Sequence, residues 1–267
     1  MVNVIVAGAA GRMGARIVRA VLEAKELELV GAYERLDHPD LGRDVGLVSG
    51  VGELGLPLAG SLDEVLEAGE VIIEFTEPRA TMADLEKAAA TGRAMVVGTT
   101  GFSPEQSARM KELGTVMRLV AAPNMSVGLN LLFKLVGEVA RILGPGYDLE
   151  IVEAHHRLKK DAPSGSALRL AEALAKATGR RLGECAVYGR EGLVGQRPEG
   201  EIGVLAVRAG DIVGDHTVIY GGIGERVEIT HRAHSRDTFA RGAVRAAAWV
   251  ADQKPGFYDM QDVLGLR

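Results

Sequence analysis

Short apolar runs rich in β-branched residues alternate with longer helical stretches through the first half of the chain. The predicted strands here are Asn3 to Ala7, Glu28 to Tyr33, Val71 to Phe75, Ala94 to Val97 and Met117 to Ala121. Strands that alternate with helices in this way are typical of parallel βαβ units. The pattern therefore predicts an α/β domain with a parallel sheet from Met1 to about Ser126.

Capping residues mark where several of the intervening helices begin. Ser61 with Glu64 and Ser103 with Gln106 have the spacing of capping boxes, and Pro104 suits a first helical position. We therefore expect a helix to begin at each of these two serines.

The pattern changes after a predicted helix from Leu129 to Leu143. Strands follow at Leu149 to Ala154, Gly203 to Arg208, His216 to Tyr220 and Arg226 to Arg232. In the last of these, Val227, Ile229 and His231 alternate with polar residues, which indicates a sheet with one covered face and one polar or shared face. This part is therefore predicted to be a second domain that could form homo-oligomers through its sheet.

A final predicted helix runs from Thr238 to Ala251. Phe239, Ala243, Ala246 and Val250 lie on one stripe of it. Such a stripe needs an apolar surface to cover it.

Composition and charge narrow the possible functions. The chain has 267 residues, 47% hydrophobic and 25% charged, with a formal net charge of −5, so a general nucleic-acid or membrane-surface role has no electrostatic support. Cys185 is the one cysteine, which excludes an intrachain disulfide and fits a reducing compartment. No apolar run approaches the roughly 20 residues that span a bilayer. We expect a cytoplasmic protein that binds neither nucleic acid nor membrane.

A glycine-rich turn follows the first predicted strand. Gly8, Gly11 and Gly14 are spaced three apart where a helix should begin, so a phosphate can approach the backbone and the helix N-terminus. Glu34 stands 20 residues after Gly14, where a carboxylate can accept from ribose hydroxyls. Arg35 and Arg12 could both reach the 2′-phosphate if the cofactor is NADPH. The pattern favours a dinucleotide cofactor. A glycine-rich turn with a purely structural role, next to exposed charged residues, would have the same sequence.

A dense polar cluster runs from Glu153 to Ala167, where a strand leads through a loop into a helix. His155 and His156 with Lys159 suit a small polyanion that must be held and protonated. Ser164 and Gly165 then open a helix whose free N–H groups can take a carboxylate. A metal site formed by His155, His156, His231 and His234 is the competing interpretation. It is disfavoured because adjacent histidines rarely point to one centre and the nearby cations would repel a metal. We therefore predict no metal.

Four motifs in order make the chain resemble the dihydrodipicolinate reductase family of the diaminopimelate and lysine pathway. They are G-R-M-G at Gly11 to Gly14, G-T-T-G-F at Gly98 to Phe102, E-A-H-H-R through D-A-P-S-G at Glu153 to Gly165, and R-A-G-D-I-V-G at Arg208 to Gly214. The resemblance implies a Rossmann-like cofactor domain of residues 1–126 with 236–267. It also implies an α+β domain of residues 127–235 that binds substrate and forms a homotetramer.

The resemblance also implies roles for individual residues. His155 would be the proton donor, assisted by Lys159, and His156, Gly165 and Ser166 would hold the substrate. NADH or NADPH would be the cofactor, with binding positions Gly8, Ala9, Ala10, Gly11, Arg12, Met13, Glu34, Arg35, Gly98, Thr99, Thr100, Ala122, Pro123, Asn124 and Met125. Ser166 stands where threonine is usual, and Met125 where many members have an aromatic residue. The serine keeps the hydroxyl, whereas the methionine puts the packing near the nicotinamide in doubt.

Two other functions compete with this one. A dehydrogenase for a semialdehyde or a sugar could use the same scaffold, and a nucleotide sensor could keep the cofactor fold without catalysis. The His-His-x-x-Lys pattern beside a helix opening argues against both.

Overall fold

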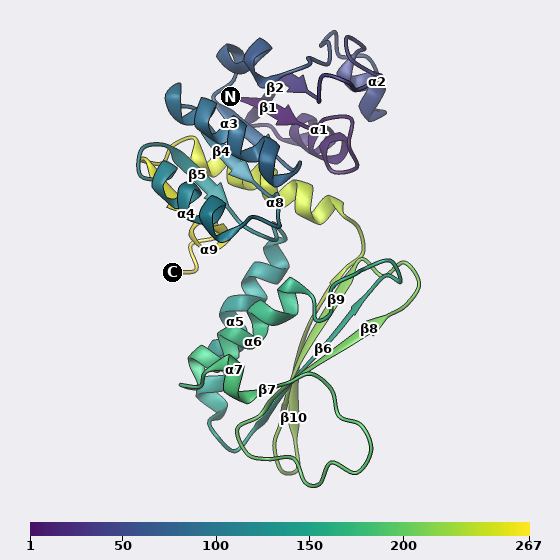
Figure 1. Cartoon of the computed structure of the whole chain (residues 1–267), viewed down its shortest axis with the longest axis vertical. Helices are drawn as coiled ribbons and strands as arrows, with labels where there is room; N and C mark the ends of the chain where they lie inside the picture. Colours follow the sequence, from purple (N-terminus) through teal and green to yellow (C-terminus); the bar gives the residue numbers. More distant parts are fainter. The chain divides into compact units, whose positions relative to one another are not determined.

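A computed structural model describes all residues from 1 to 267. The chain forms two compact units, the first made of residues 1–127 and 236–267 and the second of residues 128–235. The colours of Figure 1 show that the first unit combines the beginning of the chain with its last part. Each unit has its own sheet and its own hydrophobic core.

Unit 1 is a three-layer α/β structure. Its strands are β1 (Val2–Ala7), β2 (Leu27–Tyr33), β3 (Val71–Glu74), β4 (Ala94–Val97), β5 (Arg118–Ala121) and β11 (Gly256–Tyr258). Its helices are α1 (Gly14–Glu23), α2 (Val45–Ser49), α3 (Pro78–Ala90), α4 (Pro104–Leu113), α8 (Asp237–Val250) and α9 (Met260–Val263), with 3₁₀ turns η1 (Leu62–Glu64) and η2 (Leu66–Ala68).

All neighbouring strands of unit 1 pair in parallel, in the order β11-β5-β4-β3-β1-β2. Strands β3 and β4 are buried at every position because helices cover both faces of the sheet. Alternate residues face opposite layers, so Val4 and Val6 pack with α1 and α8, whereas Ile5 and Ala7 pack with α3 and α4. This arrangement confirms the predicted Rossmann-like α/β fold.

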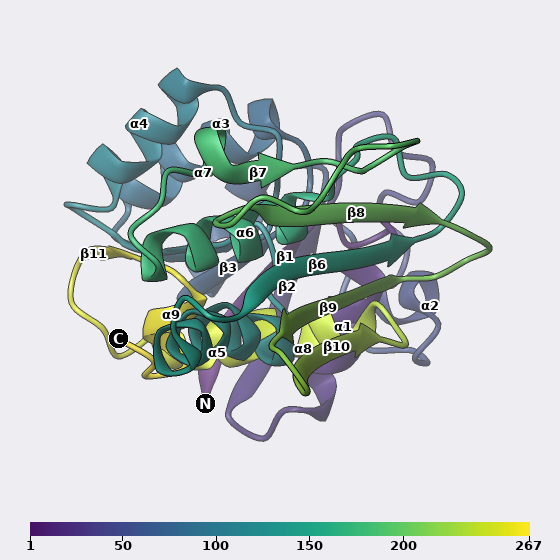
Figure 2. The same ribbon diagram turned by 90° about the horizontal axis from the view of Figure 1, so that it is seen from below.

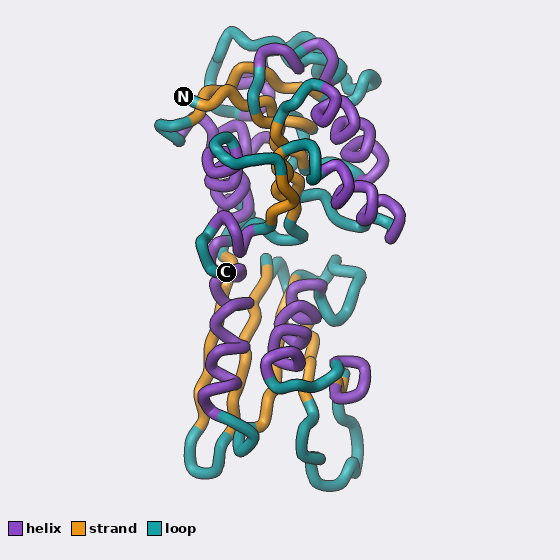
Figure 3. Tube along the Cα trace, turned by 90° about the vertical axis from the view of Figure 1, so that its left-hand side faces the viewer, coloured by secondary structure: helices purple, strands orange, loops and turns teal.

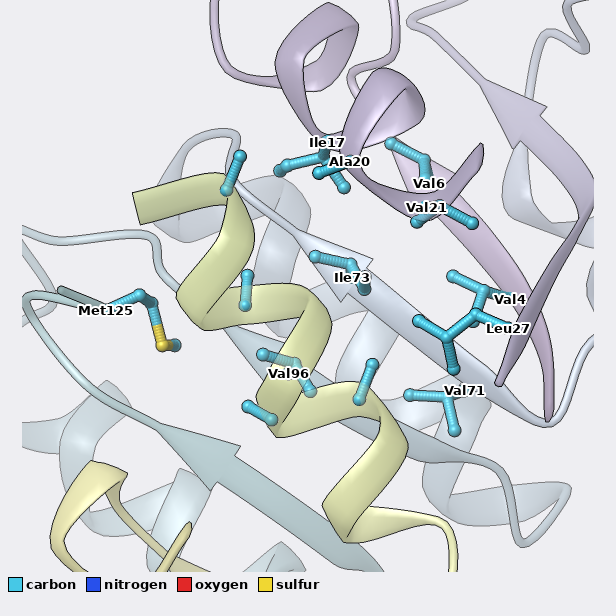
Figure 4. Close-up of a cluster of buried hydrophobic side chains, with 14 of the residues drawn as sticks. Val4, Val6, Ile17, Ala20, Val21, Leu27, Val71, Ile73, Val96 and Met125 are labelled. Atoms are coloured by element: carbon cyan, nitrogen blue, oxygen red, sulfur yellow. The ribbon is translucent and has the colours of Figure 1, made fainter. Parts of the chain in front are cut away.

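Helix α8 completes one layer of unit 1 although it follows unit 2 in the sequence. Ala243, Ala246 and Val250 are buried as their stripe predicts, but Phe239 is only half-buried. Gly242 lets the helix lie close to the segment that follows β5, because a Cβ there would come within 1.8 Å of the Met125 carbonyl oxygen. Figure 4 shows this helix crossing over Val96, with Val4, Val71 and Ile73 in the same core.

Unit 2 packs helices on one face of a mixed sheet. Its elements are α5 (Val127–Leu143), β6 (Asp148–His155), α6 (Gly165–Ala177), α7 (Leu182–Cys185), β7 (Ala186–Val187), β8 (Ile202–Arg208), β9 (Gly214–Gly221) and β10 (Arg226–Ala233). The strand order is β10-β9-β6-β8-β7, visible in Figure 2, with β9 antiparallel to both neighbours and the other pairs parallel.

The core of unit 2 lies between its sheet and helices α5 and α6. Leu132 and Val136 of α5 and Leu170 of α6 pack on Ile151 and Tyr220 of the sheet. The long helix of unit 2, drawn in purple in Figure 3, runs alongside its orange strands. On the other face Val152, Leu205 and Ile219 are half-buried and lie outside this core.

One predicted helix start is wrong. The region after Ser61 forms only the two short 3₁₀ turns, and Glu64 accepts from the Ser61 hydroxyl and the Gly60 N–H instead of closing a capping box. The capping box at Ser103 and Gln106 is confirmed. No helix in residues 1–267 combines the length and the apolar character needed to cross a membrane.

Candidate active site

The turn between β1 and α1 is shaped for close approach to its backbone. Gly8 has φ of +60°, in the left-handed region, and a Cβ on Gly14 would come within 2.0 Å of the Gly8 carbonyl oxygen. Helix α1 has no side-chain cap at Met13 and no acid in its first turn. Its N-terminal N–H groups and positive dipole end therefore suit a phosphate.

A cavity of about 530 Å³ lies at this end of the parallel strands, within unit 1. It brings together Gly8, Gly11, Glu34 and Arg35 from the predicted cofactor set. The other lining residues are Tyr33, His38, Gly60, Ser61, Leu62, Thr76, Glu77, Ala80, Asp84 and Lys87. Its size and its glycine and carboxylate lining fit the adenosine half of a dinucleotide.

The other predicted cofactor residues do not line this cavity. Ala9, Ala122 and Met125 are buried in the core of unit 1, whereas Arg12 is exposed. Thr99 forms hydrogen bonds within the protein, because its hydroxyl oxygen accepts from Thr76 N at 3.1 Å and lies 2.9 Å from the Thr81 hydroxyl. Gly98–Thr100 and residues 122–125 follow β4 and β5, at the same sheet edge as the Gly8 turn.

A buried acidic network at the cavity floor was missed from the sequence. Tyr33 Oη lies 2.7 Å from Asp84 Oδ2 and 3.1 Å from Glu74 Oε2. Burial raises the pKa of Glu74 to about 7 despite the hydrogen bond from Thr76, and burial also raises the pKa of Asp84. The sequence feature that could have revealed this network is the acid Glu74, which directly follows the apolar run Val71-Ile72-Ile73.

In unit 2, His155 stands at the end of β6 with Glu153 two residues earlier on the same face. His155 Nδ1 lies 2.6 Å from Glu153 Oε2, and both Arg208 Nη atoms donate to the Glu153 carboxylate at 2.8 Å. Glu153 is fully buried. Burial alone would raise its pKa, but the hydrogen bonds from Arg208, His155 and the Ser164 N–H lower it, so Glu153 is a carboxylate. The sequence identified Glu153 and Arg208 only as parts of motifs.

The helix opening beside this pair forms as predicted. Ser164 caps α6 by accepting from Ala167 N at 3.1 Å, so Gly165 and Ser166 occupy its first turn. The Ser164 hydroxyl also lies 3.2 Å from Nε2 of His216. Burial lowers the pKa of His216 to about 3, so this ring is neutral, and it meets His155 edge-on at 5.2 Å between centroids. His216 is a site neighbour that sequence reasoning missed.

The remaining predicted residues lie on the loop between β6 and α6. Lys159 pairs with Asp161 at 2.8 Å, and its charge is among those that lower the pKa of His155. Burial is the largest cause of that lowering and outweighs the opposing influence of Glu153. His156 is half-buried, and its Nδ1 has no hydrogen-bond partner in the protein. His155 therefore lies near two cations, Lys159 and Arg208, each of which is paired with a carboxylate.

No group of three or more His, Cys, Asp or Glu side chains is arranged to hold a metal ion. The histidine cluster instead consists of one ring paired with a carboxylate and a second, neutral ring behind it. This arrangement suits proton transfer to an anion.

Two family models together match nearly the whole chain. Residues 2–125 match the family model described as dihydrodipicolinate reductase, N-terminus, and residues 128–264 match the corresponding C-terminus. Proteins named 4-hydroxy-tetrahydrodipicolinate reductase from Citrifermentans bemidjiense and Syntrophotalea carbinolica are each 54% identical over 100% of both chains.

Solved structures of related proteins have the same fold as this chain. A dipicolinate-bound dihydrodipicolinate reductase from Paenisporosarcina sp. TG-14 has a TM-score of 0.78 and 25% identity, covering 98% of this chain and 99% of that one. An amine dehydrogenase from Mycobacterium smegmatis, at 15% identity and a TM-score of 0.60 over 96% and 94% of the chains, shares the fold. The chain thus belongs to the dihydrodipicolinate reductase family, the NAD(P)H-dependent oxidoreductases that act in diaminopimelate and lysine biosynthesis.

Proposed function

We propose that His155 is the proton donor in the reduction of 4-hydroxy-tetrahydrodipicolinate to tetrahydrodipicolinate by this chain, with Lys159 assisting. The observation that carries the assignment is the buried pair of His155 and Glu153 beside the N-terminus of α6. It combines a group that can donate a proton with a place for a substrate carboxylate, and both belong to unit 2.

In the net reaction, the substrate gains one hydride and one proton and loses its hydroxyl group as water. NADH or NADPH supplies the hydride when bound. The ring of His155 bonds through Nδ1 to Glu153, which leaves Nε2 to give the proton. Lys159 contributes positive charge close to the same ring, which favours an anionic substrate there.

Substrate binding is assigned to His156, Gly165 and Ser166. The backbone N–H groups at the start of α6 and the dipole of a 13-residue helix attract one carboxylate. Lys159 and His156 lie on the loop that leads into this helix, and they supply a positive charge and a hydrogen-bonding ring for a second carboxylate. The Paenisporosarcina reductase binds dipicolinate, which is a ring dicarboxylate of this kind.

Cofactor binding is assigned to unit 1. Gly8 to Met13 would contact the phosphates and Glu34 the adenosine ribose, because Gly8, Gly11 and Glu34 line the cavity and the turn leads into the uncapped helix α1. Arg35, which pairs with Asp37 at 3.2 Å on the surface, would contact the 2′-phosphate of NADPH. Gly98 to Thr100 and Ala122 to Met125 would flank the nicotinamide half.

We further propose that the two domains bind different ligands. Residues 1–126 with 236–267 bind the cofactor, and residues 127–235 bind the substrate. The uncovered face of the unit 2 sheet is the proposed homotetramer contact. The enzyme is expected to act in the cytoplasm.

The test of the catalytic assignment is His155→Ala. Turnover should fall about 10²- to 10⁴-fold, the usual worth of a general acid. Cofactor affinity, measured by titration calorimetry, should not change because the cofactor cavity is built from unit 1 residues. His234→Ala serves as the control, since that histidine is exposed on unit 2 and should keep full turnover. Near-normal turnover in His155→Ala would remove His155 as the proton donor.

A further inference from the structure

Four donors converge on the buried carboxylate of Glu153, two on each oxygen. Oε1 accepts from Arg208 Nη2 at 2.8 Å and from the Ser164 backbone N–H at 3.0 Å. Oε2 accepts from Arg208 Nη1 at 2.8 Å and meets His155 Nδ1 at 2.6 Å. Arg208 is in turn fixed by the carbonyl oxygens of Val207 and Asp161, each at 2.7 Å. The carboxylate is therefore held in one orientation.

This orientation determines which nitrogen of His155 carries a proton. An ionised carboxylate only accepts hydrogen bonds, so His155 Nδ1 must be the protonated nitrogen in the neutral ring. Nε2 is then the nitrogen that gains and gives a proton. It lies beside Gly214, where a Cβ would come within 3.0 Å of it, so the absence of a side chain there leaves that edge of the ring clear.

The same carboxylate also ties the ring to the helix that opens at Gly165. Ser164 donates its backbone N–H to Glu153 and caps α6 with its hydroxyl. A single buried group from β6 thus contacts both the proton donor and the proposed carboxylate-binding turn. A displacement of His155 or of Ser164 would therefore break a hydrogen bond to the Glu153 carboxylate, which holds both of them.

We propose that Glu153, held by Arg208, is the positioning residue of this active site. It fixes His155 with Nε2 available for the substrate and sets the distance from that nitrogen to the start of α6. Glu153 acts through His155 and Ser164 and does not itself meet the substrate. The inference rests on the proposed role of His155 as proton donor.

The charges around His155 make the proposal measurable through pH. Lys159 from the loop and Arg208 from β8 are cationic and disfavour the protonated ring, whereas His216 from β9 is neutral. Glu153 from β6 favours the protonated ring. Removing its charge therefore lowers the pKa of His155 further and depletes the proton-donating form as pH rises.

The experiment is Glu153→Gln. We expect kcat to fall on the order of 10- to 1000-fold, the range for loss of the group that orients a catalytic histidine. The decline of kcat at high pH should begin at lower pH than in the wild type. The KM for the cofactor should stay unchanged. In ¹⁵N-histidine-labelled protein, the neutral ring of His155 should change from one Nδ1–H tautomer to a mixture.

Glu150→Gln is the matched control. Glu150 lies on the same strand and accepts from Arg190 and Arg197 at 2.9 to 3.1 Å, but none of its contacts involves His155. This substitution removes an equivalent arginine–carboxylate cluster and should leave the pH profile unmoved. A merely structural role for Glu153 would lower the stability of both variants and move neither pH profile.

The outcomes separate this inference from the proposed function. Wild-type kcat, pH profile and tautomer in Glu153→Gln, together with an impaired His155→Ala, would overturn the positioning role alone. Normal turnover in His155→Ala would overturn the catalytic role, and the tautomer measurement would still decide whether Glu153 fixes the ring. If Glu153→Gln does not fold, Glu153→Asp keeps the charge but shortens its reach. Wild-type kcat in that variant would overturn the proposal.

Discussion

At the scale of single residues, the oxygens of Glu74, Tyr33 and Asp84 form a chain with two short contacts. Tyr33 has one hydroxyl hydrogen and lies within hydrogen-bond distance of both carboxyl groups. One hydroxyl hydrogen serves only one of the two contacts well, so a proton on one carboxyl group completes the chain of hydrogen bonds. Glu74 is fully buried and its pKa is raised to about 7, which makes it the protonated member.

This proton makes the stability of the protein depend on pH. The folded-state pKa of about 7 lies above the ordinary value of 4.5, so the folded chain binds the extra proton between these values. The contribution of Glu74 to the free energy of unfolding is fully present below pH 4.5 and decreases as pH rises through 7, by on the order of 3 kcal/mol. Denaturant unfolding at about pH 5 and about pH 8 measures the decrease.

Glu74→Gln should remove most of that decrease. A glutamine amide has no charged form and can still donate to Tyr33 while Tyr33 donates to Asp84. Glu77→Gln, at an exposed carboxylate that follows β3, is the control and should keep the wild-type dependence. An unchanged pH dependence in Glu74→Gln would assign the extra proton to another group.

At the scale of elements, helix α6 should discriminate between ligands by their number of carboxylates. One carboxylate gains the N–H groups of its first turn, and a second one needs the separate cations of the preceding loop. Pyridine-2,6-dicarboxylate should therefore inhibit competitively against substrate. Pyridine-2-carboxylate should bind about ten- to a hundredfold more weakly, corresponding to about 1.5 to 3 kcal/mol for one charged contact. Calorimetry on the same sample compares them, and equal affinities would contradict two-point binding.

The elements themselves were largely predictable because their signals are local. Alternation and β-branched runs identify every strand except the short β7 and β11, and the helices at Pro104 and Gly165 begin where their caps indicate. The region after Ser61 was mispredicted because Ser61 and Glu64 have the spacing of a capping box. The residues that follow form only a 3₁₀ turn and not an α-helix.

The site was predictable only where a motif is continuous. His155 and the opening of α6 lie within one short stretch, so sequence alone brings them together. Arg208 reaches Glu153 from a strand 55 residues later, and Tyr33 meets Asp84 from another element 51 residues away. Such contacts depend on strand pairing and on burial, which the chain order does not reveal.

At the scale of the whole molecule, the open face of the unit 2 sheet should be covered by other copies of the chain. Val152, Leu205 and Ile219 stand on it and Val207 is 45% exposed, whereas the opposite face carries α5 and α6. Light scattering coupled to gel filtration should give about four times the 28.2 kDa mass of one chain.

Ile219→Lys should shift that mass toward smaller species, because a charge would be buried in the contact. Ile142→Lys, at an 81% exposed side chain near the end of α5, should leave the mass unchanged. A wild-type mass of one chain at working concentration would rule out the sheet-mediated assembly.

The placement of α8 has a consequence for how the chain is synthesised. The ribosome makes β1 to β5 first and then all of residues 128–235 before it reaches Ala240, Ala243 and Ala246, which cover Val96 and Ile73. During that interval one apolar face of the first sheet is exposed in the nascent polypeptide while the inserted unit already has every segment it needs. Nascent chains stalled before α8 should therefore recruit chaperones through residues 1–127, and extension through Val250 should release them.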